Sequence, residues 1–507
     1  MSKLPEWLGN AVFYEIYPQS FQDTNGDGIG DLPGMIGRLD YIASLGCNAI
    51  WVNPWYDSPF GDAGYDVRDY KKIAPRYGAN ADAKRFFEAA HARGMHVLID
   101  LVPGHTSIDH PWFLQSERAE KNEFTDRYVW SDSVWEATDL PCLRGISDRN
   151  GSVAVNFFSH QPALNYGYAR RTRPWMMAPD SPSALATREA IKDVMRFWLD
   201  MGADGFRVDM AASLVKADED SAETIRLWQD FRAFLDREYP HCAMVSEWGI
   251  PAKSIEGGFH MDFMLHFGPP AYTSLFRSEH PFFSREGKGD IRIFLDAYLA
   301  DLSSTHGKGL ICIPSGNHDM PRLAHGREMR DLKICFAFLL TMPGAPFLYY
   351  GDEIGMRYLE GLTSVEGGYE RTGSRSPMQW EKKPGFGFTS AETSYIPFDP
   401  SADAPTVSEQ SADETSLLSA IKQLLALRAA HPCLQSFGEF LPVFAEKERY
   451  PFAYERRGGG ERVLVVLNPA DREEEAPFDC SGKVLWSVGG VPKDKKVPAR
   501  SACLIAK

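Results

Sequence analysis

Eight short runs of β-branched and aromatic residues recur along the first two-thirds of the chain, and helical patterns separate them. Strands that alternate with helices are joined by crossovers and lie parallel to one another. Eight such strands fit a closed barrel better than an open sheet, so the sequence predicts an α/β chain with a (β/α)8 TIM barrel. The runs cover residues 11–21, 49–54, 96–102, 205–210, 243–248, 261–267, 310–317 and 346–353.

The segments between these runs carry the helical period. Apolar residues recur at helical spacing in residues 32–46, 81–94, 185–202 and 225–240, and each pattern stops near a Gly or a Pro. We therefore expect one helix in each of these segments.

Two parts of the chain depart from the alternation and give the expected domain boundaries. Residues 104–183 are rich in Trp, Pro and Asp, and predict an irregular domain inserted after the third strand. After a helical pattern at 416–432, strand-like segments separated by Gly- and Pro-containing turns predict an all-β sandwich at 433–507. The barrel then comprises residues 1–103 and 184–432.

Composition limits the possible partners and the compartment. The formal net charge of −15 argues against nucleic acid as a partner, because phosphate-binding surfaces are basic. No run of about 18 apolar residues predicts a membrane span, and MSKLPEWLGN lacks the apolar segment of a signal peptide. The eight cysteines are scattered without a CxxC pair, which predicts reduced thiols and a cytoplasmic location. Oligomeric state is left open.

One strand-like run, GFRVDMA at residues 205–211, carries two opposite charges. Arg207 and Asp209 are two residues apart, so they point to the same face of a strand. In a barrel that face is the interior, and catalytic residues collect at the C-terminal strand ends. An Arg beside a carboxylate keeps it ionised. The pair is either a nucleophilic carboxylate with its cationic partner or a structural buried ion pair.

Three other runs also end in polar or charged residues, which favours the catalytic interpretation because buried charges are costly. These residues are Asp100 and His105 after the third run, Glu247 after the fifth, and His318 and Asp319 after the seventh. Two carboxylates on facing strands suit glycoside hydrolysis. Asp209 suits the ionised nucleophile, and Glu247 suits the acid, whose pKa burial must raise. A separation of about 5–5.5 Å between them predicts retention of anomeric configuration.

The segments DLVPGH, GFRVDMA, SEWG and SGNHD, in this order, resemble four motifs of the α-amylase superfamily, glycoside hydrolase family 13. The likeness extends over most of the chain. The resemblance implies that Asp209 is the nucleophile, that Glu247 is the acid/base, and that Asp319 binds and distorts the sugar. It also implies substrate-binding roles for Asp62, Tyr65, His105, Arg207 and His318.

Other segments resemble the oligo-1,6-glucosidase and α-glucosidase branch, which includes trehalose synthases: IYPQSF, GDGIGDLPGM, QPALN, GDEIGM and RSPMQW. Ala163 stands where that branch usually carries Asp. Gly104 stands where many amylases carry a calcium-binding Asn, so we expect no calcium between barrel and inserted domain. Met210, which follows the nucleophile, matches neither of the usual choices and leaves linkage preference open.

The acidic stretch DTNGDGIGD at residues 23–31 resembles the first nine positions of a calcium loop. Gly34 replaces the final bidentate Glu, so the segment is not an EF-hand. With the family likeness, it predicts one structural Ca²⁺, with Mg²⁺ as the second choice, and no organic cofactor. A metal-free Asx-rich turn is the alternative. The expected ligands are Asp23, Asn25, Asp27, the Ile29 carbonyl and Asp31.

Aromatic residues are frequent in the inserted region, and aromatic faces stack on the apolar faces of sugars. One or two of six such residues are therefore expected to line the site. The six are Trp112, Trp130, Trp135, Tyr166, Tyr168 and Trp175.

These features predict a retaining glycoside hydrolase that cleaves α-glucosidic bonds of short gluco-oligosaccharides by double displacement through a covalent glycosyl-enzyme. Its partner is then a small oligosaccharide. A transglycosidase or isomerase of the trehalose synthase kind uses the same residues with a sugar as acceptor, and an endo-acting amylase or cyclodextrinase is a further alternative. Non-catalytic members of the superfamily usually lack a catalytic carboxylate, whereas Asp209, Glu247 and Asp319 are all present.

Overall fold

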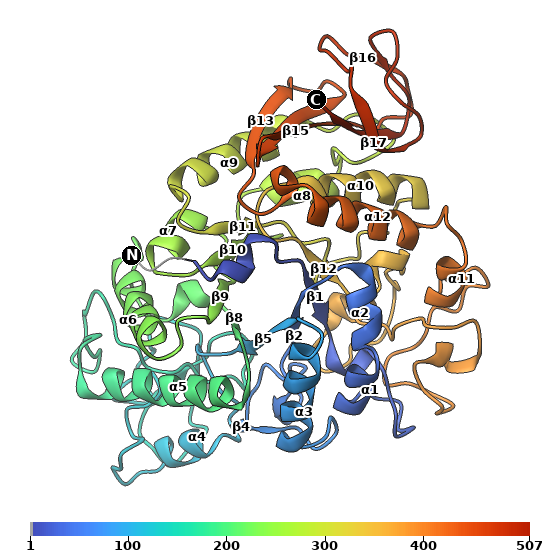
Figure 1. Ribbon diagram of the computed structural model, residues 1–507. Helices are drawn as coiled ribbons and strands as arrows, with labels where there is room; N and C mark the ends of the chain where they lie inside the picture. Colours follow the sequence, from blue (N-terminus) through green and yellow to red (C-terminus); the bar gives the residue numbers. More distant parts are fainter. Residues whose placement is uncertain (1–3) are drawn as a thin grey trace.

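A ring of eight parallel strands surrounded by helices forms the centre of the computed structural model, which describes residues 4–507 (Figure 1). Residues 1–3 of the expected barrel segment lie outside the described residues. A bridge between Pro314 and Phe347 joins the two end strands of the sheet. The predicted barrel is confirmed, and each expected run contains one strand. The strands are β1 (Phe13–Ile16), β2 (Ala49–Val52), β5 (His96–Leu101), β8 (Gly205–Val208), β9 (Ala243–Ser246), β10 (Met261–Phe263), β11 (Leu310–Cys312) and β12 (Phe347–Tyr349).

The expected helices are present, but one of them is divided. The segment predicted as a single helix at 32–46 forms α1 (Leu32–Gly37) and α2 (Leu39–Leu45), because Arg38 between them has a non-helical backbone (φ −107°, ψ 3°). The other expected helices are α3 (Asn80–His91), α5 (Pro182–Met201), α6 (Ala222–Glu238) and α12 (Leu417–Ala430). Further helices are α7 (Pro251–Glu256), α8 (Ala271–Phe276), α9 (Ile291–Ser304), α10 (Met329–Thr341) and α11 (Val407–Ser411).

The insertion lies between β5 and α5 and contains little regular structure. It holds α4 (Pro111–Ser116) and a hairpin of β6 (Cys142–Arg144) and β7 (Ser152–Ala154). A small apolar cluster of its own includes Val129, Ala163 and Trp175. A second hairpin, which the sequence did not indicate, follows β2 and consists of β3 (Tyr56–Asp57) and β4 (Asp69–Ile73).

The C-terminal part is an antiparallel β domain, as predicted, beside α10 and α12 (Figure 1). One face of its main sheet contributes to the large core shared with the barrel helices, and the other covers a small cluster that includes Ala476 and Val497. The main sheet comprises β13 (Glu439–Phe444), β14 (Phe452–Gly458), β15 (Glu461–Asn468), β19 (Ser501–Ala506) and β17 (Lys483–Val488). The second layer is only β16 (Glu474–Glu475) with β18 (Lys496–Val497).

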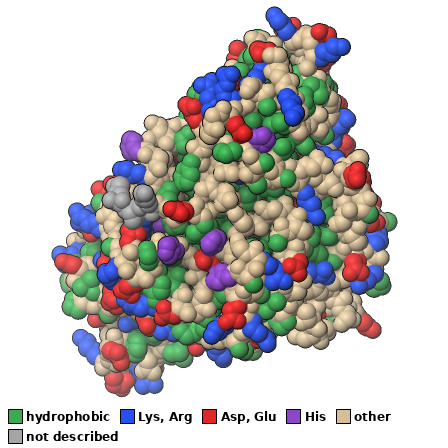
Figure 2. Space-filling model, in the orientation of Figure 1, with side chains coloured by type: hydrophobic (Ala, Val, Ile, Leu, Met, Phe, Trp, Pro, Cys, Tyr) green, Lys and Arg blue, Asp and Glu red, His purple; other side chains and the backbone are tan. Residues whose placement is uncertain are grey.

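The surface charges, the cysteine thiols and the lengths of the helices have no unusual features in the described part of the chain. Acidic and basic side chains are interspersed on the face drawn in Figure 2. All eight cysteines are free, and six of them are buried. Within residues 4–507, no helix combines the length and the apolar character needed to cross a bilayer.

The barrel interior changes from apolar to charged towards the C-terminal ends of the strands. Side chains alternate between the two faces of a strand, so inward-facing residues are two apart. On β5 the inward residues are Leu98 and then Asp100, and on β1 they are Phe13 and then Glu15. Leu8, in the 3₁₀ helix η1 (Glu6–Gly9), joins the apolar interior cluster. The charged layer above this packed core is where the candidate site begins.

Asp204, the residue before β8, connects neighbouring strands at the opposite, N-terminal end of the barrel. Its carboxylate accepts the Val97 N–H (2.8 Å) and contacts His91 Nε2 (2.8 Å) and His96 Nδ1 (3.1 Å). Burial alone would raise the pKa of Asp204, but the hydrogen bonds from His91 and His96 lower it to about 2. The same bond raises the pKa of His91. The ion pair therefore adds stability that is lost when acid protonates Asp204 and when rising pH deprotonates His91.

Asp204→Asn is expected to lower the free energy of unfolding by about 1 kcal/mol at about pH 5, a value typical of partly exposed pairs that solvent screens. The difference should shrink at about pH 9, where His91 is neutral. Thermal unfolding of the wild-type protein and of Asp204→Asn across this pH range measures the difference in stability. A deficit that stays constant with pH would contradict the ion pair, and His91→Gln should weaken the pH dependence, because His96 still contacts Asp204.

Candidate active site

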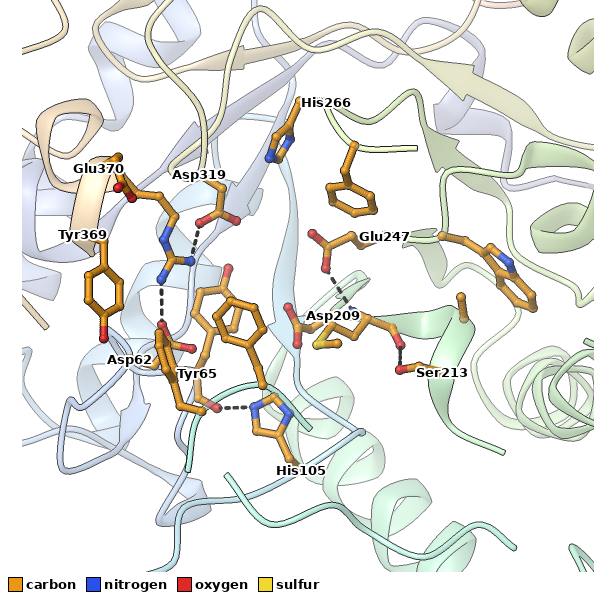
Figure 3. A pocket seen from close by; sticks show the side chains of 17 residues that line it. Asp62, Tyr65, His105, Asp209, Ser213, Glu247, His266, Asp319, Tyr369 and Glu370 are labelled. Atoms are coloured by element: carbon orange, nitrogen blue, oxygen red, sulfur yellow. Dashed lines mark hydrogen bonds and ion pairs between the residues drawn. The ribbon is translucent and has the colours of Figure 1, made fainter. Parts of the chain in front are cut away.

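A cavity of about 580 Å³ lies at the C-terminal ends of the barrel strands (Figure 3), a size typical of small-molecule sites. Four kinds of segment supply its walls. They are the strand ends (Asp209, Glu247, His266, Asp319), the β3–β4 hairpin (Asp62, Tyr65), the insertion (His105, Phe157, Phe158) and the loop after β12 (Tyr369, Glu370, Arg371). The predicted catalytic carboxylates thus share one cavity, and six of the eight predicted catalytic and substrate-binding residues line it.

Arg207 connects the two predicted catalytic acids. Its Nη1 lies 3.1 Å from Asp209 Oδ1, and its Nη2 lies 2.9 Å from Glu247 Oε1. Nη1 also lies 2.7 Å from Asp100 Oδ1 on the adjacent strand β5. Arg207 is only 2% exposed and does not line the cavity. One buried cation behind the wall therefore orients both acids towards the same space.

The backbone turns sharply after Asp209. Met210 has a left-handed conformation (φ 44°, ψ 42°) before the 3₁₀ helix η3 (Ala211–Ser213). This strained conformation is unusual for a residue with a long side chain, and such strain is often found at functional sites. The turn directs the Met210 N–H to Glu247 Oε2 at 3.0 Å. Both oxygens of Glu247 are therefore held, one by Arg207 and one by this amide.

Three main influences act on the pKa of Asp209. Burial is the largest influence and raises the pKa of Asp209, the nearby Glu247 carboxylate raises it further, and Arg207 lowers it. The net direction is upward, so in the pKa of Asp209 the influence of Arg207 does not offset burial and the nearby Glu247. Two like charges that share one cation repel each other, which adds to the effect of burial on the pKa of Asp209.

Asp319 has the opposite electrostatic surroundings. Burial would raise its pKa, but His318, Arg371 and Arg375 outweigh burial and hold the pKa far below its usual value. Arg371 Nη1 lies 2.9 Å and Arg375 Nη2 3.1 Å from Asp319 Oδ1, and His318 Nε2 lies 3.2 Å from Oδ2. Asp319 is therefore a permanent anion in the cavity wall.

Arg371 also closes one end of the cavity. Its Nη2 lies 3.3 Å from Asp62 Oδ1, and Gln161 Nε2 donates to Asp62 Oδ2 at 2.8 Å. Burial raises the pKa of Asp62, while Arg371 and Gln161 lower it. Arg371 therefore lies between Asp62 and Asp319, and Figure 3 shows Tyr369 beside Asp62. Carboxylates and a guanidinium thus form a polar end that can hold several sugar hydroxyls.

Two histidines position Tyr65 in the wall. The Tyr65 hydroxyl lies 2.8 Å from His318 Nε2, and the rings stack with centroids 5.4 Å apart. His318 Nδ1 lies 2.9 Å from the buried Glu15 carboxylate, and His318 itself does not line the cavity. His105 Nε2 donates to the Tyr65 carbonyl at 3.1 Å. Burial lowers the pKa of His105 to about 3, so it stays neutral at ordinary pH.

The two departures from the usual motifs each have a structural correlate. A Cβ atom at Gly104 would lie 2.7 Å from Asn156 Nδ2, the atom that lies 3.0 Å from His105 Nδ1. Glycine thus leaves room for the Asn156–His105 contact. Ala163 is buried in the insertion's apolar cluster and forms a bridge with His105. An aspartate in that cluster would bury a charge beside apolar side chains.

The acidic loop at 23–31 folds around its own hydrogen bonds. Asp23 accepts the N–H groups of Asn25, Gly26 and Gly28, and Asp31 caps α1 by accepting the Gly34 N–H. Within residues 4–507, no three Asp, Glu, His or Cys side chains are grouped so as to hold a metal. The donors are oxygens of the kind that Ca²⁺ prefers, but here they stabilise the turns. The expected Ca²⁺ stays a prediction.

Sequence reasoning missed several residues of the cavity. None of the six aromatic residues expected in the insertion lines it, and Phe157 and Phe158 do so instead. Gln161 lies in the quoted segment QPALN, whose likeness could have indicated it. Arg371 lies in the 3₁₀ helix η5 (Tyr369–Ser374), for which the sequence showed no periodic pattern. His266 lies near the end of the strand-like run at 261–267, but the sequence analysis did not single it out.

Comparison with known proteins agrees with this geometry. The model of the α-amylase catalytic domain matches residues 15–436. A trehalose synthase/amylase of Mycobacterium tuberculosis is 34% identical, over 92% of this chain and 82% of its own length. An oligo-1,6-glucosidase of Parageobacillus thermoglucosidasius is 30% identical, over 92% and 91%. The crystal structure of an isomaltulose synthase from Protaminobacter rubrum superposes with a TM-score of 0.83 at 26% identity, over 99% of this chain and 100% of its own.

Proposed function

The chain belongs to the α-amylase family, and on this premise we propose that it is a retaining glycoside hydrolase that cleaves α-glucosidic bonds of short gluco-oligosaccharides. One observation carries the proposal: Asp209 and Glu247 contact the same buried guanidinium and line the same cavity. Paired carboxylates at a sugar-sized cavity are the machinery of glycoside hydrolysis.

The proposed reaction has two displacements. In the first, Asp209 attacks the anomeric carbon, the bond to the glycosidic oxygen breaks, and Glu247 gives that oxygen its proton. In the second, Glu247 takes a proton from water, the water oxygen attacks the anomeric carbon, and the ester bond to Asp209 breaks. Each displacement inverts the centre, so the released glucose keeps the α configuration.

The contacts of Glu247 set a condition on the first step. Its Oε1 is bound to Arg207 and its Oε2 to the Met210 N–H. To act as an acid, Glu247 must direct one protonated oxygen at the substrate, so one of these two contacts has to give way when the glycosidic oxygen arrives.

The closed polar end supports exo action. Arg371 joins Asp62 to Asp319, and the rings of Phe158 and Tyr369 lie 6.0 Å apart, so the insertion meets the loop after β12 there. A long glucan cannot pass through a closed end. We propose that the terminal, non-reducing glucosyl unit binds there, which limits cleavage to one unit at a time.

Product analysis tests this proposal. The protein is incubated with maltose, isomaltose, maltotriose, trehalose, sucrose, cyclodextrin and starch, and the products are followed by chromatography and by NMR of the first-formed anomer. Glucose released in step with substrate loss, first as the α anomer, is expected. Intact substrates throughout, or β-glucose as the first product, would refute it.

The comparisons also favour a second candidate, glucosyl transfer or isomerisation. A trehalose synthase/amylase and an isomaltulose synthase are among the similar proteins, and such chemistry needs only a sugar hydroxyl in place of water in the second displacement. New disaccharides accumulating with little free glucose would identify it. Opening of cyclodextrin and a rapid fall in starch chain length would instead identify an endo-acting enzyme.

We also propose that the loop at 23–31 binds one Ca²⁺ that stabilises the fold, with no catalytic step assigned to it. Adding Ca²⁺ to chelator-treated protein should raise the thermal midpoint, because a ligand at about 100 times its Kd adds about 2.7 kcal/mol to stability. Mg²⁺ should raise it less. Asp27→Ala should remove the response to Ca²⁺, because it deletes one of the expected ligands. Asp27 is an exposed loop residue, so the change does not disturb the core. Unchanged midpoints at millimolar Ca²⁺ would favour the metal-free turn.

A further inference from the structure

His266 follows β10 and points into the cavity between Asp319 and Glu247 (Figure 3). Neither displacement described above uses it. Its position is nevertheless close to the reaction, because both flanking carboxylates influence its pKa. A polar ring in this place needs an explanation.

The hydrogen-bonding state of His266 can be argued from its surroundings. Within residues 4–507 neither ring nitrogen has a hydrogen-bond partner, and Nδ1 is buried. An unpaired buried N–H is rarer in proteins than an unpaired acceptor, so the proton belongs on Nε2. Burial lowers the pKa of His266, although Asp319 and Glu247 raise it. The ring is therefore a neutral group that offers an N–H donor to the cavity.

The wall around His266 differs from the closed end. Phe267 is 52% exposed, and its ring meets that of His266 edge-on at 5.2 Å. Trp248, next to Glu247, also lines this part. Near Asp62, charged groups lie beside the rings of Phe158 and Tyr369, whereas here one neutral donor lies among the rings of Phe267 and Trp248 and the carboxylates of Asp319 and Glu247. Aromatic faces with one hydrogen-bonding group suit a neutral sugar ring.

The reaction geometry places the leaving group on this side. Glu247 protonates the glycosidic oxygen, so the sugar attached to that oxygen must lie next to Glu247. Asp62 and Arg371 occupy the opposite end and hold the glucosyl unit that is transferred. His266 and Phe267, together with Trp248, line the cavity and are available to contact the leaving sugar.

We propose that His266 Nε2–H donates a hydrogen bond to a hydroxyl of the leaving-group sugar, whose apolar face lies against Phe267. His266 then selects a sugar over other leaving groups, and the same contact holds a sugar acceptor during transfer. This inference rests on the proposed function.

Two substitutions at His266 isolate the donor. His266→Phe keeps a ring but removes the N–H, and His266→Gln places an amide N–H close to the position of Nε2. The measured quantity is the ratio of kcat/KM for the best disaccharide from the product analysis to that for 4-nitrophenyl α-glucoside, whose leaving group carries no sugar hydroxyl. His266→Phe should lower this ratio about tenfold, as expected for loss of one hydrogen bond. His266→Gln should keep it within about threefold.

Disaccharides that each lack one hydroxyl on the leaving sugar give a second test. With the wild-type protein, one of them should react about tenfold more slowly in kcat/KM than the parent disaccharide, because it lacks the partner of His266. With His266→Phe that penalty should disappear, as in a double-mutant cycle. If His266→Phe fails to fold, the same deoxy substrates are tested with His266→Gln. This variant should keep the penalty, and the penalty should fall on one hydroxyl only.

The outcomes are separable. An equal loss on both substrates in His266→Phe, or a deoxy penalty that persists in it, would overturn the role of His266 while leaving the hydrolase intact. A wild-type protein that cleaves no α-glucoside would overturn the proposed function, and this inference with it.

Discussion

Asp209→Asn is expected to lower kcat/KM for α-glucosides by about 10⁴-fold or more, because an amide cannot form the glycosyl ester that divides the reaction into two steps. The exchange is nearly isosteric, and the contacts of Arg207 with Asp100 and Glu247 need not change. The loss should therefore lie in turnover rather than in stability. Initial rates on the best substrate and thermal unfolding of the same preparation measure both.

The same strand offers a matched control. Asp204 lies before β8 and Asp209 after it, at opposite ends of the barrel. Asp204→Asn makes the same carboxylate-to-amide change far from the cavity, and should lower stability while activity persists. Residual activity above about 10% in Asp209→Asn, or an equal loss in Asp204→Asn, would remove Asp209 from the nucleophile's role.

The charged layer of the barrel could be predicted because its position follows from a short-range rule. Residues two apart share a strand face, and parallel strands end at one rim, so Asp100, Arg207 and Asp209 had to lie close together once the barrel was assumed. The structure places Asp100 and Arg207 directly opposite each other in the register of β5 and β8. Local periodicity was enough for these residues.

The closed end of the cavity could not be predicted in this way. Arg371 lies in a short 3₁₀ helix of the segment after β12. Ion pairs and ring contacts hold this segment against distant parts of the chain, such as Glu366 with Arg76 and Tyr369 with Phe158. These contacts join residues far apart in the chain and leave no repeating pattern in the sequence. A likeness to known motifs indicated Asp62, but not the arginine that faces it.

The pKa of Asp209 also depends on how close Glu247 lies to it, and a sequence does not contain that distance. Arg207 is adjacent in the pattern, and its influence was evident. Glu247 follows the next strand, and in the structure it contacts both Arg207 and the Met210 N–H. Burial and like-charge repulsion then outweigh the visible neighbour.

Glu247→Gln is expected to affect the two displacements differently. On a disaccharide, kcat/KM should fall by about 10²–10⁴-fold, the range for loss of a general acid. α-Glucosyl fluoride needs no proton on its leaving group, so its first displacement should proceed. The second displacement needs Glu247 as a base and should become slow. One fluoride per protein molecule should therefore appear in a rapid burst, followed by slow turnover.

The pH dependence of that burst gives a further check on the electrostatics. Glu247 raises the pKa of Asp209 in the wild-type protein, and a neutral Gln removes that influence while Arg207 remains. The ionised form of Asp209 should then persist to lower pH, and the acid limb of the burst rate should move downwards in pH relative to the first displacement of the wild type. Rapid mixing with a fluoride-selective electrode measures the burst rate at each pH. An acid limb that moves upwards, or equal losses on fluoride and disaccharide without a burst, would mean that Glu247 is not the acid/base partner of Asp209.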